Sequence, residues 1–281
     1  MEPFALDKKS NEPELLWLQR WMTAIPGLSA GFTTRNGGDS EREYRSLNIG
    51  LHVGDDPAAV VDNRRRVSHA AGFPFDAWTC SEQVHGDRVR TVLREDRGAG
   101  RLSRGDAFAD TDAIITSESG IMLAAFYADC VPLYFVDPIH HVIGLAHAGW
   151  KGTALRIAER TIERMEEAFG TVRTELYAAI GPSIGGCCYE VDERVVQQLG
   201  IEPALQLGIE PLRRKENGRY MLDLKEVNRQ FMIRTGMKPN HIEQSGFCTC
   251  CSADLFFSHR GENGRTGRMA AWIGWKEEVN S

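Results

Sequence analysis

The sequence predicts a layered globular domain of the α/β or α+β class. Strand-length apolar runs bounded by turn residues recur between residues 113 and 148. From Thr153 onward the apolar residues change to helical spacing. The composition, with 42% hydrophobic and 26% charged residues among 281, is that of an ordinary globular protein. Strands that alternate with helices are typical of such layered domains.

Four buried strands are expected in the middle of the chain. Each is an apolar, β-rich run that ends at a polar or turn-forming dipeptide such as Asp129-Cys130 or Asp137-Pro138. The runs are "AIIT" (113–116), "IMLAAFYA" (121–128), "VPLYFV" (131–136) and "HVIGLAHA" (141–148).

A helix is expected after these strands, beginning near Thr153 and ending at Gly170. Its broad apolar face contains Leu155, Ile157, Ala158, Ile162, Met165 and Phe169. Three further strands are expected at "ELYAAI" (175–180), "HIEQSGF" (241–247) and "RMAAWIGW" (268–275).

The chain is expected to form a single domain over residues 1–281. No internal repeat, low-complexity tract or long linker is present. Residues 94–110 and 199–219 are the best candidates for flexible connections, because both are rich in charge and glycine. Neither segment divides the chain convincingly.

Charge and cysteine usage restrict the class of protein. The formal net charge of −6 argues against a nucleic-acid partner, and no stretch approaches the roughly 18 apolar residues of a membrane helix. The N-terminus lacks the features of a secretory signal. Seven cysteines, an odd number, do not suggest a disulfide framework. A cytoplasmic location is therefore expected.

Three residues at abrupt strand ends form a candidate metal site: His85 in "SEQVHGD", Cys130 in "YADCVP" and His147 in "LAHAGW". Two imidazoles and a thiolate suit zinc, and three protein ligands leave a fourth position open for catalysis. The residues alone also allow hydrogen-bonded structural histidines and a buried cysteine, because no compact ligand motif is present.

Several motifs, in their order and separation, resemble the YfiH/YlmD family, also called the laccase-domain or polyphenol-oxidase-like family. They are "GFTTRNGG", "SLNIGLHVGDDPAAVVDNRRR", "SEQVHGD", "ADCVPLYF", "AHAGWKG", "GPSIGGCCYEV" and "HRGENGRTGRMAAWIG". The resemblance extends from about residue 30 to the C-terminus. It implies an α+β fold of mixed sheets covered by helices, with His85, Cys130 and His147 as both the metal ligands and the catalytic residues.

The resemblance also implies an activity. Members of this family are zinc-dependent purine nucleoside phosphorylases that act on adenosine, inosine, guanosine and methylthioadenosine, with additional adenosine deaminase activity. Zinc lowers the pKa of water and so suits deamination. Phosphorolysis requires that phosphate be held against the ribose while the leaving base is stabilised. The expected partners are purine nucleosides and phosphate, and a monomer or homodimer is expected.

Five residues are candidates for binding phosphate or nucleoside. Lys151, before the predicted helix, and Arg35, in the "TTRNGG" turn, are candidate anion holders. His259 and Arg260, in a glycine-rich loop, are candidates to contact ribose, phosphate or base. Asn48 is a candidate to orient a substrate hydroxyl, although asparagine is also a common turn residue.

The other glycine and cysteine motifs favour structural roles. "GPSIGG" (181–186) lacks the lysine and hydroxyl residue of a phosphate-binding P-loop, so a tight corner after a strand is expected. "CTCC" (248–251) and Cys187-Cys188 raise the possibility of a structural zinc site. Cys-x-Cys-Cys departs from the common two-residue spacing, so buried or reactive thiols are favoured.

Three other functions use the same residues. A copper-dependent polyphenol oxidase would use the two histidines and the cysteine as copper ligands. A Cys130 hydrolase, such as an amidase that edits cell-wall peptide precursors, would use His85 or His147 as its base. A non-enzymatic interaction module would require a closed four-ligand zinc site, for which the sequence offers no obvious fourth partner.

Overall fold

Two six-stranded mixed sheets form the centre of the protein, as seen in a computed structural model that describes residues 2–7, 12–201 and 211–277. The first sheet has the spatial order β1 (Ala5–Asp7), β2 (Leu15–Trp17), β3 (Leu28–Thr33), β15 (Met269–Trp275), β7 (Met122–Tyr127) and β4 (Trp78–Cys80). The second has the order β14 (Ile242–Gln244), β10 (Tyr177–Ile180), β8 (Val131–Asp137), β9 (Val142–Ala148), β6 (Ala113–Thr116) and β5 (Val89–Thr91). A small third sheet has the order β11 (Glu190–Val191), β13 (Tyr220–Leu222) and β12 (Leu212–Arg214).

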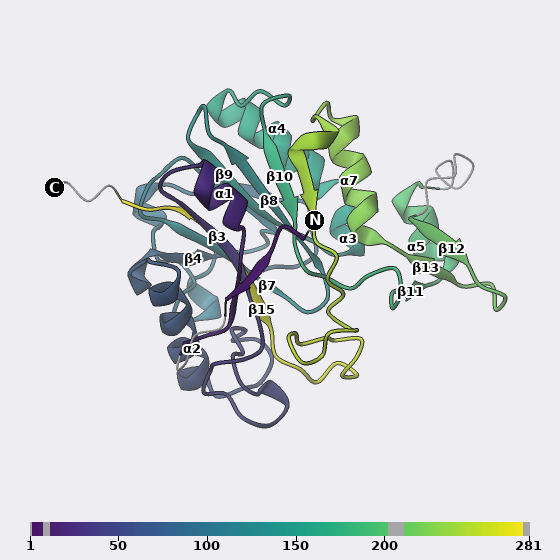
Figure 1. Cartoon of the computed structure of the whole chain (residues 1–281), viewed down its shortest axis with the longest axis horizontal. Coiled ribbons are helices and arrows are strands. Elements are labelled where there is room, and N and C mark those ends of the chain that lie inside the picture. Colours follow the sequence, from purple (N-terminus) through teal and green to yellow (C-terminus); the bar gives the residue numbers. More distant parts are fainter. Residues whose placement is uncertain (1, 8–11, 202–210, 278–281) are drawn as a thin grey trace.

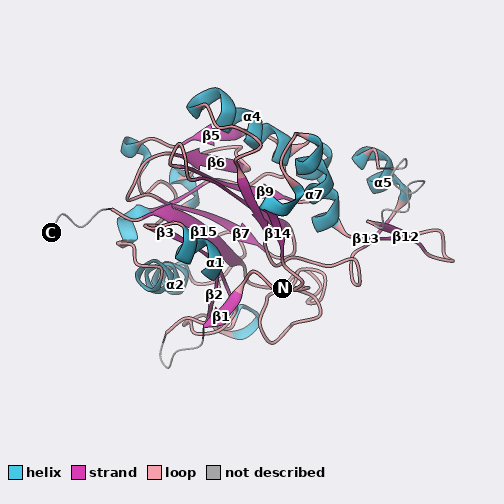
Figure 2. Cartoon of the chain, turned by 45° about the horizontal axis from the view of Figure 1, so that its top comes forward, coloured by secondary structure: helices cyan, strands magenta, loops and turns pink. Residues whose placement is uncertain are grey.

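Helices cover the outer faces of the two large sheets (Figures 1 and 2). The described α-helices are α1 (Gln19–Ala24), α2 (Pro57–Ala70), α3 (Trp150–Ala154), α4 (Ile157–Phe169), α5 (Glu193–Leu199) and α7 (Leu224–Arg234). Short 3-10 helices lie at Arg42–Tyr44, Phe75–Ala77, Arg94–Asp96, Arg104–Asp106 and Pro239–His241. Helix α2 packs on the first sheet, whereas α4 and α7 pack on the second. The predicted α+β class of mixed sheets covered by helices is confirmed.

The central strands are apolar along their whole length because both faces of each large sheet are buried. In β7, Leu123 and Tyr127 point into the core between the sheets, while Met122 and Phe126 point toward the α2 side. In β8, Tyr134 joins the core between the sheets and Phe135 joins the core under α4. Successive strand residues face opposite sides, so burial of both sides requires a continuous apolar run.

The predicted strands and helix are found, with one difference in the helix. All seven predicted strands overlap observed strands: β6 to β10, β14 and β15. The predicted helix is divided into α3, which begins at Trp150, and α4. Arg156 separates them with a left-handed φ of 66°, and its guanidinium lies 3.7 Å from the centre of the Phe231 ring. Gly170, at φ 73°, ends α4 as predicted.

The predicted connections contain local structure where they are described. Residues 94–110 include the two 3-10 helices Arg94–Asp96 and Arg104–Asp106. Within 199–219, residues 202–210 lie outside the described part of the chain. The single domain over residues 1–281 and the cytoplasmic location stay predictions. Among the described residues, no helix has the length and apolar character needed to cross a membrane.

Candidate metal centre

The three predicted ligands come together where the chain passes between the two large sheets. His85 lies in the loop that leads from β4 in the first sheet to β5 in the second. Cys130 lies in the turn that joins β7 of the first sheet to β8 of the second. His147 is the penultimate residue of β9 and is 3% exposed. The fold thus brings together residues that are 17 to 62 positions apart in the sequence.

The donor atoms of His85, Cys130 and His147 all lie within 4.8 Å of one another. The Cys130 Sγ and His85 Nε2 atoms are 3.7 Å apart, and the centres of the two imidazole rings are 4.8 Å apart. Gly149 leaves room for this arrangement. A Cβ atom there would lie 2.9 Å from Cys130 Sγ and 2.8 Å from His85 Cδ2.

Asp112 orients both histidine segments, and the sequence analysis missed it. Its carboxylate lies 2.9 Å from His147 Nδ1 and accepts hydrogen bonds from the backbone amides of Val84, His85 and Gly86 at 2.7 to 3.1 Å. Its backbone carbonyl accepts from the His147 amide. Because Nδ1 is engaged, the Nε2 atom of His147 remains for a metal.

Asp112 directly precedes the predicted strand 113–116, but this position indicates a role for Asp112 only when the partner of that strand is known. In the structure Ala113 pairs with Ala146, which places Asp112 next to His147. An acidic residue at a strand start is common and carries no pairing information by itself. The antiparallel register of β6 and β9 supplies that information.

The electrostatics of the cluster favour a thiolate at Cys130. Burial raises the pKa of this thiol, but the charge of His147 and hydrogen bonds from His147 and His85 outweigh burial and lower the pKa to about 6. Burial lowers the pKa of His147, while Cys130 and Asp112 raise it to about 9. The metal-free protein therefore favours a thiolate–imidazolium pair, and a metal would replace the proton on His147.

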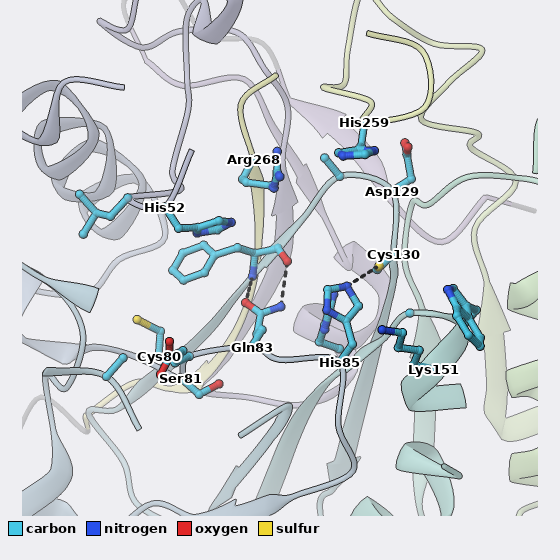
Figure 3. Close-up of a pocket in the computed structure, with 18 of the residues that line it drawn as sticks. His52, Cys80, Ser81, Gln83, His85, Asp129, Cys130, Lys151, His259 and Arg268 are labelled. Atoms are coloured by element: carbon cyan, nitrogen blue, oxygen red, sulfur yellow. Dashed lines mark hydrogen bonds between the residues drawn. The ribbon is translucent and has the colours of Figure 1, made fainter. Parts of the chain in front are cut away.

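The cluster forms one wall of a pocket with a volume of about 520 Å³. Figure 3 shows His85, Cys130 and Lys151 on one side of this space, with His52 and Arg268 across from them. Its apolar lining includes Leu51, Phe126, Ile184, Tyr189 and Leu224. Its basic and imidazole lining includes His52, Arg64, Arg104, Lys151, His259, Arg260 and Arg268.

Gln83 fixes the loop that carries His85 to the first sheet. Its side-chain amide donates to the Phe126 carbonyl at 2.9 Å, and its side-chain oxygen accepts from the Phe126 amide at 2.8 Å (Figure 3). These two bonds satisfy the backbone amide and carbonyl of Phe126 in β7, which lies on one side of the pocket. Gln83 belongs to the motif "SEQVHGD" but is not among the residues predicted to have a role.

Three of the five predicted substrate residues line the pocket: Lys151, His259 and Arg260. The Arg260 amide donates to the Asp129 carboxylate at 2.8 Å, and its guanidinium lies 5.3 Å from the centre of the Tyr189 ring. The structure therefore brings these three side chains to the same space as the metal ligands.

Arg35 and Asn48 are not among the lining residues, because their polar groups are engaged elsewhere. Arg35 donates to the Ala253 carbonyl at 3.1 Å and forms an ion pair with Glu262 at 3.0 Å. Asn48 is fully buried and accepts from the Arg268 amide at 2.8 Å. Both residues thus support segments that reach the pocket.

His52, Arg104 and Arg268 are basic or imidazole lining residues that the sequence analysis did not identify as candidates. Arg268 begins the predicted strand 268–275, so its position at a strand start was visible in the sequence. His52 and Arg104 lie in segments without a predicted element. Only the folded chain places them opposite the metal ligands.

This α+β fold, with a His–Cys–His metal-binding cluster in a pocket, defines a class of metal-associated proteins. The chain belongs to the family described as multi-copper polyphenol oxidoreductase laccase, whose model matches residues 29–276.

Named relatives extend over nearly the whole chain. Purine nucleoside phosphorylase YlmD from Geobacillus stearothermophilus is 46% identical over 264 residues, which cover 93% of this chain and 95% of that protein. Purine nucleoside phosphorylase YlmD from Bacillus subtilis is 40% identical and covers 98% of each chain. The crystal structure of the hypothetical protein YfiH from Bacillus licheniformis matches with a TM-score of 0.91 and 41% identity, covering 98% of this chain and 100% of that chain.

Proposed function

We propose that this protein is a purine nucleoside phosphorylase. It would convert adenosine, inosine, guanosine or methylthioadenosine and phosphate into the free base and the corresponding pentose 1-phosphate. The observation that carries this proposal is the pocket in which an open three-ligand cluster faces basic side chains and apolar walls. The names of the two YlmD relatives support the same reaction.

Zinc fits the donor set of the cluster. Two imidazole nitrogens and one thiolate are ordinary zinc donors, and a carboxylate that holds the second nitrogen of a histidine is a common outer partner of zinc ligands. His147 and Asp112 have this relationship. A mononuclear copper site with two histidines and a cysteine also uses a weak axial ligand, usually methionine. No methionine is among the described residues that line the pocket, and the amide of Gln83, the other possible axial ligand there, is bonded to the backbone of Phe126. Zinc is therefore the metal we propose.

The residues of the chain suit the two substrates. Lys151, Arg260 and Arg268 bring positive charge to the pocket, which favours binding of a phosphate dianion. Phe126 and Tyr189 provide flat apolar surface for a purine. Phosphorolysis forms a bond from a phosphate oxygen to the anomeric carbon and breaks the bond to the base, whose nitrogen takes the electron pair. Donors held near that base would stabilise the negative charge that develops on it.

Adenosine deamination is the second activity that we propose. Bound zinc would supply Lewis acidity, which water needs in order to replace the 6-amino group of adenosine at neutral pH. Three protein ligands are the number expected for such a catalytic zinc site.

A direct assay tests both activities. Zinc-loaded protein is incubated with adenosine, with and without phosphate, and adenine, inosine, hypoxanthine and ribose 1-phosphate are separated and quantified. We expect ribose 1-phosphate in an amount equal to adenine plus hypoxanthine only when phosphate is present, and inosine in both conditions. Absence of phosphate-dependent base release from adenosine, and from inosine, guanosine and methylthioadenosine in parallel incubations, would refute the phosphorylase proposal.

Three variants connect the assay to the structure. His147→Ala should abolish both activities, whereas His140→Ala should retain them, because His140 lies in the β8–β9 turn against Asp137. Lys151→Ala should raise the phosphate concentration needed for half-maximal rate by roughly tenfold, the scale of one charged hydrogen bond at an exposed site. Its zinc content should not change. An unaltered phosphate requirement would mean that Lys151 is an ordinary solvent-exposed lysine that does not bind phosphate.

A hydrolase with Cys130 as its nucleophile is the second candidate, because the pKa of this thiol is lowered to about 6 beside His147. Such an enzyme would work without metal. Hydrolysis of a cell-wall peptide precursor by chelator-treated protein, with no nucleoside turnover by the zinc-loaded form, would favour it over the phosphorylase.

A further inference from the structure

Four cysteines from two distant segments meet outside the pocket cluster. Cys187 and Cys188 lie in the loop between β10 and β11, and Cys248 and Cys251 lie in the loop between β14 and β15. Their four Sγ atoms all lie within 4.8 Å of one another. The sequence leaves a structural zinc site possible for these residues, but the Cys-x-Cys-Cys pattern of residues 248–251 and the family resemblance, which assigns no metal there, favour buried or reactive thiols.

The distances between sulfur atoms suit a shared metal. Cys251 Sγ lies 3.5 Å from Cys187 Sγ and 3.3 Å from Cys188 Sγ. A disulfide requires about 2.05 Å, and all four cysteines are free. Four thiolates placed tetrahedrally at about 2.3 Å from zinc lie about 3.8 Å from one another. The observed separations are close to that value.

The surrounding backbone is arranged for close approach of the two loops. The Gly185 amide donates to Cys248 Sγ at 3.2 Å. A Cβ atom at Gly185 would lie 3.3 Å from both Cys187 Sγ and Cys248 Cβ, so a side chain there would crowd the cluster. Ser183 and Cys248 form an isolated parallel bridge, and the Thr249 amide donates to the Ser183 carbonyl at 3.1 Å.

A buried cation lies beside the cluster. Lys225 is 4% exposed, and its ammonium donates to the Ser245 and Phe247 carbonyls at 2.8 and 2.9 Å, directly before Cys248. Four thiolates around a divalent cation carry a net charge of −2, which a neighbouring ammonium partly offsets.

We propose that Cys187, Cys188, Cys248 and Cys251 hold a structural zinc ion in a closed four-thiolate site. Cys248 and Cys251 have the two-residue spacing typical of zinc ligands, and the other pair comes from the opposite loop. Four protein ligands leave no position for substrate, which distinguishes this site from the open cluster in the pocket.

The proposed zinc would fix one wall of the pocket. Tyr189, a lining residue, directly follows Cys188, and the segment after Cys251 continues to His259 and Arg260. The Arg260 guanidinium already joins the two loops by donating to the Cys188 carbonyl at 3.4 Å. A metal that crosslinks the loops would limit their relative motion without contacting substrate.

Metal analysis with zinc X-ray absorption tests the proposal without any assay of activity. Protein is produced with zinc, kept reduced and purified without chelator. We expect about two zinc ions per chain in the unmodified protein and one in the Cys130→Ala/His147→Ala double variant. In that double variant, the remaining zinc should have four sulfur neighbours at about 2.3 Å. These readouts do not depend on whether the protein phosphorolyses nucleosides.

Single cysteine variants locate the second ion. Cys188→Ser should reduce the zinc content from two to one, while the zinc that remains has mixed nitrogen and sulfur neighbours. Cys250→Ser is the matched control. It lies between Cys248 and Cys251 but does not belong to the group of four, so it should retain both ions.

The unmodified protein decides the question even if a cysteine variant fails to fold. One zinc per chain, bound only by nitrogen and sulfur in the mixed site, would overturn the proposal. A disulfide between the two loops, detected by mass spectrometry of protein purified under reducing conditions, would also overturn it. Iron in place of zinc at the four thiolates would refute the assignment of the metal.

Discussion

Asp112 is the residue on which both histidines of the pocket cluster depend. Each of its carboxylate oxygens accepts two hydrogen bonds. One oxygen accepts from the amides of Val84 and Gly86, and the other accepts from the His85 amide and from His147 Nδ1. An asparagine would turn one oxygen into a donor that faces other donors. A neutral, shape-conserving change therefore breaks the arrangement that orients the metal ligands.

We predict that Asp112→Asn weakens zinc binding by about 10- to 100-fold, the usual effect of losing an outer partner of a metal ligand. Competition with a chromophoric chelator measures the dissociation constant. Asp110→Asn is the control, since Asp110 is exposed in the same segment and should leave the constant unchanged. Equal affinities for Asp112→Asn and the unmodified protein would show that His147 keeps its orientation without the carboxylate.

The reactivity of Cys130 should report its imidazole neighbours. The pKa of this thiol is lowered to about 6, so in metal-free protein the thiolate fraction rises with pH through about 6 and is nearly complete at pH 7.5. Alkylation at Cys130, followed by mass spectrometry after chelator treatment, should have its midpoint near that pH. His147→Ala should move the midpoint upward, because it removes the cation that stabilises the thiolate. His140→Ala should not.

Two outcomes would contradict this interpretation. A midpoint near 8.5 in the unmodified protein, the ordinary value for a cysteine, would mean that the imidazoles do not stabilise the thiolate. Alkylation of Cys130 at equal rates in zinc-loaded and metal-free protein would mean that the sulfur is not a metal ligand.

At the scale of elements, the turn from β9 to α3 determines whether the ligands can meet. Gly149 lies between the strand that carries His147 and the helix that carries Lys151. Its missing side chain is required by close approach, since a Cβ atom would lie less than 3.0 Å from both His85 and Cys130. The backbone turn alone does not require glycine, because Gly149 has a φ of −72°.

We predict that Gly149→Ala displaces the two ligands and weakens zinc binding by about 10- to 100-fold, comparable to the loss of an outer partner. Gly105→Ala is a matched control, because the nearest atom to a Cβ there is 3.7 Å away. Far-ultraviolet circular dichroism should show that both variants fold. Full zinc content after dialysis of Gly149→Ala would show that the ligands adjust to the methyl group.

The elements that the sequence predicts are those whose burial leaves a clear pattern of apolar residues. β7, β8 and β9 are buried on both faces and therefore appear as continuous apolar runs. β4 and β5, which flank His85, have three residues each, too few to establish any period. α2 was missed because its apolar face is narrow, although Asp56 and Pro57 form a helix start whose side-chain cap is present in the structure.

At the scale of the whole molecule, the sequence identifies the three candidate metal ligands chiefly through family motifs. Residues alone leave His85, Cys130 and His147 unconnected, since their proximity depends on two crossings between the sheets. Asp112 and Arg268 reach the site through strand pairing and long-range packing, which no local pattern encodes. For the same reason, the sequence does not predict that the four cysteines lie together, because the proximity of their two segments cannot be deduced from the spacing within either one.

Because two of the three candidate ligands in the pocket lie on connections between the sheets, a metal bound at this cluster would join both halves of the layered core. Residues 81–88 connect β4 to β5, and residues 128–130 connect β7 to β8. Local opening of these connections would separate the ligands, so metal binding should oppose it. Amides in α2, which packs on the far face of the first sheet, have no such dependence.

We therefore predict that zinc removal accelerates amide hydrogen exchange at residues 81–88 and 128–130 and leaves α2 unchanged. Cys130→Ala should show the faster exchange at these connections before any chelator is added, with little further change afterward. Residues 183–188 and 248–251 should respond to chelator equally in Cys130→Ala and in the unmodified protein, since their proposed metal is separate. Uniform acceleration over the whole chain, α2 included, would mean that metal stabilises only global folding and does not act through the two crossings.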